Sequence, residues 1–382
     1  MNNIISVIEF TSTDIKMILG YKFHKKTYVI KTFISNKINL DINSLLDKSS
    51  CYDEINRMID DVKKEFKDPN IFSNLVVLLP SIGYETSKST TEVMTVDPSS
   101  LIIQNDYQNS VEKVTSSCKI SGKVLVYNEP LSFKDSFNRS YNDLPIGLKS
   151  DKLIIKFENQ FIDEFVYNHY MSILSELNLN VKLTLLSSVC ASHFITSFSS
   201  ISDYIQLEID ENHSLISQVL NKRVESSTNL DFGNGFAINQ AMSQNISNKN
   251  ELERVLLENG LDEKISYDAI DIDNNEVSLK NYMNAIKYGY DLYLNKLKPF
   301  IDNYHNASLP LVLYGKEANI SSLDIYFQNF FQRQVFVFES KVIGARGPKF
   351  INCLGALNIS SYSYISFVDI KENNTGFSDL RG

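Results

Sequence analysis

Residues 205–218 read IQLEIDENHSLISQ: an apolar run ends in Glu208, a polar loop follows, and a second apolar run returns. Residues 4–19 read IISVIEFTSTDIKMIL and repeat this order around Glu9, about half the chain length earlier. Each stretch is typical of two strands joined by a polar turn. Two copies at this spacing predict a duplicated core whose polar loops face each other across a cleft.

The remaining periodicity repeats the same plan in both halves. Helical stripes follow each set of strands, for example Ile55, Met58, Ile59 and Val62 on one face. A fully apolar run at 75–79 is typical of a strand buried on both faces. Each half therefore reads strand–strand–strand–helix–strand, which predicts an α/β protein with one mixed sheet per half. The first three strands of the two halves are expected at residues 4–10, 14–20 and 27–34, and at 204–210, 214–220 and 223–229.

Insertions interrupt both halves. Residues 83–158 read as strand, helix, strand, strand, with a Pro/Gly turn at 145–147, and a polar, acidic insertion follows in the second half. The predicted organisation is a first half of residues 1–82 and 159–200, an inserted subdomain of 83–158, a second half of 201–358 with 249–278 in its insertion, and a polar tail of 359–382.

Composition excludes several classes of protein. Hydrophobic residues at 43% and charged residues at 22% are globular values for a chain of 382 residues. The net charge of −9 argues against a nucleic-acid partner, because phosphate backbones need a basic face. No apolar run approaches the roughly 20 residues of a membrane-spanning helix. The four scattered cysteines contain no CxxC pair, so neither a metal site nor a disulfide framework is expected, and a reducing cytoplasm fits best.

Three loops carry the candidate site. Residues 9–16 (EFTSTDIK), 208–214 (EIDENHS) and 315–318 (GKEA) resemble, in this order, the two phosphate loops and the adenosine loop of the actin-like ATPases. That resemblance implies a nucleotide site, with Gly233 and Asn234 in a further glycine loop that leads into a helix. The implied binding residues are Glu9, Thr11, Ser12, Thr13, Lys16, Glu208, Asp210, Asn212, His213, Ser214, Gly233, Asn234, Gly315, Lys316 and Glu317. Because the phosphate loops are degenerate, no catalytic residue and no dedicated metal ligand are expected here.

Two further stretches resemble the bacterial cell division family FtsA within this superfamily. Residues 143–148 (DLPIGL) with 152–157 (KLIIKF) are similar to its Pro-x-Gly-Met turn and closing strand, and 232–240 (FGNGFAINQ) to its Gly-Gly loop and helix. The implied fold is a duplicated actin-like (ribonuclease-H-like) α/β fold with an inserted strand-helix-strand-strand subdomain in the first half. FtsA proteins usually end in an amphipathic membrane helix, whereas residues 371–381 contain only two large apolar residues, so membrane attachment is expected to be indirect.

The phosphate loops depart from the family pattern at its glycines. Thr11, Asp210 and Lys316 stand where glycine lets backbone N–H groups approach phosphates. Asp210 and Glu211 add carboxylates, and like charges about 4 Å apart repel by roughly 4 kcal/mol at a surface-like dielectric. Mg²⁺ held by Glu9 or Glu208 would offset part of this repulsion, and Lys316 would add a phosphate contact. The sequence predicts weak or no ATP binding and no ATP hydrolysis.

The resemblance implies a non-catalytic adaptor in cell division. Such a protein would recruit or organise filaments of the tubulin-like GTPase FtsZ, polymerise itself, and lie at the division site on the inner face of the cell membrane. Two alternatives remain open from the sequence. One is an ATP-dependent enzyme of the actin and sugar kinase superfamily, which would need Asp residues and open glycine loops. The other is an actin-like pilus-assembly protein with a similar subdomain.

Overall fold

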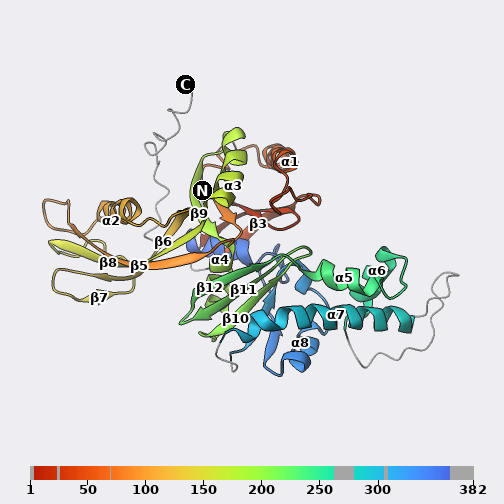
Figure 1. The fold of residues 1–382 in the computed structure, drawn as a ribbon. Coiled ribbons are helices and arrows are strands. Elements are labelled where there is room, and N and C mark those ends of the chain that lie inside the picture. The colour runs from red at the N-terminus through yellow and green to blue at the C-terminus, as the bar shows by residue number, and fades with distance from the viewer. Residues whose placement is uncertain (1–3, 24–25, 69, 262–278, 305–308, 362–382) are drawn as a thin grey trace.

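The computed structural model describes residues 4–23, 26–68, 70–261, 279–304 and 309–361. Two five-stranded sheets and one smaller sheet make up its strands (Figure 1). Predictions that concern 262–278 and 362–382, which include most of the second insertion and the polar tail, lie outside the described residues.

The two large sheets have the same strand order, as the duplicated sequence pattern predicts. The first runs β3-β2-β1-β4-β9, and the second runs β12-β11-β10-β13-β14. In each, an antiparallel meander is extended by two parallel strands, because the later strands return through helical connections. The strands are β1 (Ile5–Phe10), β2 (Ile15–Phe23), β3 (Lys26–Ile34), β4 (Leu75–Leu79) and β9 (Val181–Leu186), and β10 (Tyr204–Ile209), β11 (Ser214–Leu220), β12 (Arg223–Leu230), β13 (Leu311–Tyr314) and β14 (Val335–Val337).

Helices cover these sheets and complete two separate cores. In the first, α1 buries the predicted stripe but begins earlier than the periodicity indicates, because the Asp47 carboxylate accepts the backbone N–H of Ser50 at 2.9 Å and caps the helix. In the second, α7 buries its long stripe beside α5. The helices are α1 (Lys48–Phe66), α3 (Glu164–Glu176), α4 (Ser187–Phe198), α5 (Asn234–Met242), α6 (Lys249–Asn259), α7 (Leu279–Asp302), α8 (Leu323–Phe331) and α9 (Ile351–Ile359).

The inserted subdomain projects from one side of the first half (Figure 1). Its elements are β5 (Glu85–Met94), α2 (Gln104–Ser117), β6 (Lys123–Lys134), the two-residue β7 (Ser140–Tyr141) and β8 (Lys152–Asp163), in the sheet order β5-β8-β6-β7. A core of its own lies between α2 and this sheet. The expected α/β class with a strand-helix-strand-strand insertion is thus confirmed.

The position of α9 (Ile351–Ile359), the last described helix, differs from the sequence prediction. Residues 201–358 were expected to form the second half, whereas α9 packs in the core of the first half, against α4 and β1. Every residue of α9 is buried and none is charged, which suits a helix that lies between the two halves. Gly355 permits the close approach: a Cβ there would lie 1.8 Å from the Cys190 carbonyl oxygen of α4.

None of the helices in the described ranges has the length and apolar character that crossing a membrane requires.

Candidate functional site

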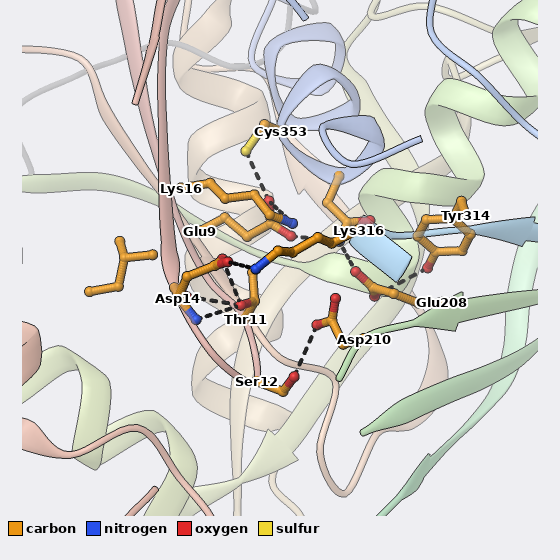
Figure 2. Close-up of polar contacts among 12 residues, drawn as sticks. Glu9, Thr11, Ser12, Asp14, Lys16, Glu208, Asp210, Tyr314, Lys316 and Cys353 are labelled. Atoms are coloured by element: carbon orange, nitrogen blue, oxygen red, sulfur yellow. Dashed lines mark hydrogen bonds and ion pairs between the residues drawn. The ribbon is translucent and has the colours of Figure 1, made fainter. Parts of the chain in front are cut away.

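The loops after β1 and β10 face each other, and α9 joins them. Glu9 lies near the end of β1 and Glu208 near the end of β10. The Asn352 Nδ2 donates to an oxygen of each carboxylate, at 2.7 Å in both cases. Cys353 donates its thiol to the second Glu9 oxygen at 3.0 Å (Figure 2). The first two residues after the start of α9 therefore bond the equivalent acids of the two halves.

A lysine fills the centre of this site. The Lys16 ammonium lies 3.6 Å from Glu9 Oε2, and both side chains are at most 2% exposed (Figure 2). Among the described residues, Lys16 Nζ has no hydrogen-bond partner. Burial acts to lower the pKa of Lys16, but the carboxylates of Glu9, Asp210, Asp14 and Glu208 outweigh it and raise that pKa. Lys16 is a permanent internal cation among four acids.

In the first phosphate loop, backbone N–H groups are hydrogen-bonded to a side chain of the same loop. The Thr11 hydroxyl oxygen accepts the backbone N–H groups of Thr13 at 3.2 Å and Asp14 at 3.0 Å. The same hydroxyl lies within hydrogen-bond distance of the Asp14 carbonyl and carboxylate. A phosphate would need these N–H groups. Thr11 stands where actin-like ATPases have glycine. Its hydroxyl therefore occupies backbone N–H groups that a glycine at this position would leave free to bind phosphate.

The second loop is closed in a similar way. The Asp210 and Glu211 carbonyl oxygens each accept an N–H from the first turn of α5, from Asn234 and Gly235, both at 2.8 Å. A Cβ at Gly233 would lie 2.1 Å from the Asp210 carbonyl oxygen, so only glycine lets the helix start so close to the loop. The helix N-terminus, which attracts anions where it is open, is thus partly covered by the loop's backbone.

The adenosine loop is also bonded to its surroundings. Gly315 has φ of 104° and begins the 3-10 turn η1 (Lys316–Ala318). The Lys316 ammonium lies 3.1 Å from the Asp14 carboxylate of the opposite half (Figure 2). Glu317 accepts a hydrogen bond of 3.0 Å from Asn234, whose amide oxygen accepts the Tyr290 hydroxyl.

Hydrogen bonds and charge pairs cross the cleft at further points. Ser12 donates to the Asp210 carboxylate at 3.2 Å, and Lys37 pairs with Glu211. Burial, with Asp210 and Glu9 nearby, raises the pKa of Glu208 to about 8. Glu208 therefore holds its proton more strongly than an ordinary glutamate does, which limits the repulsion that the four acids exert on one another.

The room left in the cleft is small. The cavity bounded by the two loops, with Tyr170 and Leu215 in its walls, has a volume of about 50 Å³. Pockets for small organic ligands hold roughly 300–1,000 Å³. With the loop amides bonded, Lys16 in place and two acids at the loop positions, the residues present do not fit a nucleoside triphosphate in this arrangement. Within the described ranges, no three His, Cys, Asp or Glu side chains are grouped to hold a metal ion.

The structure brings most of the predicted residues to one place and directs others elsewhere. Glu9, Thr11, Ser12, Lys16, Glu208, Asp210 and Lys316 meet at the cleft, and His213 lines its cavity. Thr13 contributes its backbone N–H to the first loop. Ser214 instead bonds the Tyr293 hydroxyl at 2.7 Å in the second core. Asn212 has no side-chain hydrogen bond to any described residue.

Sequence reasoning missed Asn352, Cys353, Asp14 and Tyr314. Tyr314 donates to Glu208 at 3.4 Å. One feature of the sequence could have indicated Asn352. It is a lone amide near the start of an otherwise apolar run, FINCLGAL, and a buried amide needs hydrogen-bond partners. That signal indicates a bonded side chain but not its partners.

Comparison with known proteins identifies the fold. The sequence matches no protein-family model and no curated protein. In structure it is similar to the ethanolamine utilization protein EutJ from Carboxydothermus hydrogenoformans, with 11% identity, a TM-score of 0.52, and coverage of 93% of this chain and 89% of that one.

Two other solved structures agree. A chain of the PilM-PilN type IV pilus biogenesis complex has 10% identity and a TM-score of 0.56, with 95% of this chain and 98% of that chain covered. MreB5 of Spiroplasma citri bound to AMPPNP has 10% identity and a TM-score of 0.51, with 94% and 96% covered. These matches confirm the actin-like ATPase fold that the loops predict, and at such identities they show the fold alone.

Proposed function

We propose that this protein is a non-catalytic, actin-like adaptor whose two halves are held together by its own side chains rather than by a nucleotide. One observation carries the proposal: Asn352 bonds Glu9 and Glu208 at 2.7 Å each, beside the buried cation Lys16. In an actin-like ATPase, phosphates and a metal ion would connect the two loops. Here an amide and an ammonium connect them.

The bonding of the loop amides supports the absence of catalysis. Phosphoryl transfer depends on positioned phosphates and on charge stabilisation by N–H groups and metal ions. Thr11 occupies the N–H groups of its own loop, and Lys316 is paired with Asp14. A protein built in this way acts through its surfaces, with the cleft as a structural connection between the halves.

The finer proposal is an FtsA-like role, in which the protein recruits or organises FtsZ filaments and associates with itself. The strand-helix-strand-strand insertion and the turn at 145–147 support it, together with the actin-like fold. Attachment to the inner face of the membrane through another protein is part of the same proposal. It would place the chain in the cytoplasm at the division site.

Sedimentation with FtsZ polymers of the same organism tests this role. The protein is pelleted with full-length FtsZ and with FtsZ that lacks its C-terminal tail, each with ATP, with ADP and without nucleotide. We expect co-pelleting that requires the tail and does not change with nucleotide. Co-pelleting only with ATP would contradict the closed cleft, and no co-pelleting in any condition would contradict the FtsZ role.

Nucleotide itself is tested separately. We expect phosphate release from ATP to stay at the background rate, and a fluorescent ATP analogue to show no saturable binding at micromolar concentration. Release above background that disappears in Glu9→Gln would establish an enzyme and remove the proposal.

A second candidate is an adaptor for a pilus-type assembly partner. The structural match to a chain of the PilM-PilN complex, over 95% of this chain, favours it. The two candidates differ in the sedimentation experiment, because an adaptor of this second kind has no requirement for the FtsZ tail.

A further inference from the structure

A second cleft lies apart from the loops, between the inserted subdomain and the β11–β12 hairpin of the second half. It has a volume of about 310 Å³, six times that of the cavity between the loops. Lys88 of β5, Leu131 of β6 and Lys156 of β8 line one side. The turn residue Asn221 and the β12 residues Arg223 and Glu225 are on the other. We call this the subdomain cleft. Its volume is within the range of small-ligand pockets.

Positive charge gathers in the subdomain cleft of an acidic chain. The protein has a net charge of −9, yet three cations and one carboxylate line this cleft. Concave sites with an excess of one sign of charge attract ligands of the opposite charge. The lining therefore favours an anionic ligand.

The three cations are incompletely paired. Lys88 lies 3.9 Å from Glu158 and 3.7 Å from Glu225, and Arg223 lies 3.9 Å from Glu129, all beyond hydrogen-bond distance. Arg223 Nε is buried and has no hydrogen-bond acceptor among the described residues. Buried donors without acceptors are rare in proteins and need an explanation. A bound carboxylate would supply the missing acceptors.

Two strand edges and apolar side chains border the same cleft. β5 ends one sheet and β12 ends another, so each has one side without a strand neighbour in the described chain. The two strands approach each other, and Tyr84 beside β5 donates to the Val224 carbonyl of β12 at 3.0 Å. Leu131 and Leu220 add apolar surface to the lining. Free strand edges bind extended peptides through backbone hydrogen bonds, and neighbouring side-chain pockets give specificity.

We propose that the subdomain cleft binds an extended peptide of a partner protein, with at least two acidic side chains and an adjacent apolar one. Acidic groups of the peptide pair with Lys88, Lys156 and Arg223, and the apolar side chain contacts Leu131 or Leu220. This site is distinct from the loops, and its argument does not use the adaptor role, so it stands whether or not that role is correct.

Selection from a random peptide library tests the chemistry of the ligand. Full-length protein is used to select twelve-residue peptides displayed on phage, with Lys88→Glu/Lys156→Glu protein for counter-selection. We expect the enriched peptides to carry an excess of Asp and Glu beside Leu, Ile, Val or Phe. Enrichment of peptides without excess acid, or no enrichment above the counter-selected protein, would overturn the proposal.

Fluorescence anisotropy with the most enriched peptide, labelled with fluorescein, measures the contribution of one cation. Lys156 is exposed and forms no ion pair with a described residue, so Lys156→Glu is expected to fold normally, with an unchanged melting temperature. It should weaken binding about tenfold or more by reversing a contacting charge. Lys64→Glu, at an exposed position of α1 outside the lining of the cleft, is the control and should change binding less than about twofold because its charge is screened by solvent and salt. If the Lys156→Glu variant binds the peptide as tightly as the unchanged protein does, the proposed site is wrong.

Two further arms separate a peptide from a small anion and locate the contact. Millimolar inorganic phosphate, compared with potassium chloride of equal ionic strength, should not displace the peptide. Full displacement by phosphate would mean a small-anion site and would overturn the peptide assignment. A peptide that carries a photoreactive benzoylphenylalanine should cross-link to tryptic fragments that contain residues 131–132, 220–222 or 224–225. Cross-links confined to other fragments would also overturn it.

Discussion

The ammonium of Lys316 lies 3.1 Å from the carboxylate of Asp14, which joins two loops 302 positions apart in the sequence. Lys316 belongs to η1 of the second half, and Asp14 belongs to the first loop of the other half. The Asp14 side chain is almost fully buried and the Lys316 side chain is 41% exposed. The pair therefore combines a buried acid, costly to leave unpaired, with a lysine at the rim of the cleft.

Replacing this lysine tests how strongly the pair holds the halves together. Lys316→Ala removes this cation from a buried carboxylate whose remaining side-chain hydrogen bond, within the described ranges, comes from Thr11. We expect the free energy of unfolding, measured by urea denaturation, to fall by about 1–2 kcal/mol. Lys298→Ala removes a surface pair with Asp302 in the same half and is the control, with an expected loss below about 0.5 kcal/mol. Equal losses in the two variants would contradict a special role for the cleft pair.

The shared amide gives a second prediction. Asn352→Asp keeps the shape of the side chain but places a third carboxyl between Glu9 and Glu208, and one donor that served both acids is lost. Breaking a buried charge network of this kind costs about 3–5 kcal/mol. We expect a large fall in the melting temperature that is greater at pH 8 than at pH 6, since deprotonation of the new group adds to the repulsion.

Asn295→Asp provides the comparison for that variant. Asn295 lies on the exposed side of α7, where its amide donates to the Asp291 carbonyl. The same chemical change there should leave the melting temperature nearly unaffected at both pH values. A small effect of Asn352→Asp at pH 8 would mean that the amide does not connect the halves.

The raised pKa of Glu208 predicts how the stability of the folded protein changes with pH. Burial, with Asp210 and Glu9 nearby, raises its pKa to about 8, against 4.5 for an ordinary glutamate. Between these values the folded protein holds a proton that the unfolded chain releases, so stability falls as pH rises from about 4.5 to about 8. Glu158, whose pKa burial and nearby Glu129 raise to about 7, acts in the same direction over a lower window.

Thermal unfolding of Glu208→Gln across this pH range measures the effect. The glutamine has no proton to lose, and its side-chain oxygen still accepts the bond from Asn352. The slope of stability against pH should decrease by up to about one proton per molecule. An unchanged slope would mean that Glu208 is ionised in the folded state, and that the acids around Lys16 are balanced in another way.

The sequence predicts the fold well because alternation and helical stripes are local properties that repeat. The matching hairpins at Glu9 and Glu208 place both loops correctly, and the three motifs place Lys16 and Lys316 at one cleft. Two errors have physical causes. β8 continues to Asp163, past the end of the insertion predicted at residue 158, because the mixed polar and apolar spacing there suits either a strand or a helix. The sequence does not indicate that α9 joins the first half, because a buried helix without charged residues gives no sign of which core it enters.

The state of the site is not predictable from the motifs alone. Replacement of glycine by Thr11 indicates a lost phosphate contact, but not that the hydroxyl would bond the amides of Thr13 and Asp14. Asn352 is distant in sequence from every loop, and its two acceptors are set by how α9 packs. Such pairings depend on the tertiary arrangement, which has no local signature.

Restoring the glycines is the most direct test of why the cleft is closed. Thr11→Gly frees two loop amides, and Asp210→Gly removes one carboxylate that faces the first loop and its bond to Ser12. Neither position has a positive φ, so the cost to the fold is that of added backbone freedom, roughly 0.5–1 kcal/mol each. We expect the double variant to bind a fluorescent ATP analogue at least about tenfold more tightly than the unchanged protein, since a repulsion of roughly 4 kcal/mol is removed in part. Thr11→Ser, which keeps the hydroxyl, is the control and should not gain binding. If the double variant folds and gains none, then Lys16 and the Asn352 amide, rather than the lost glycines, exclude the nucleotide.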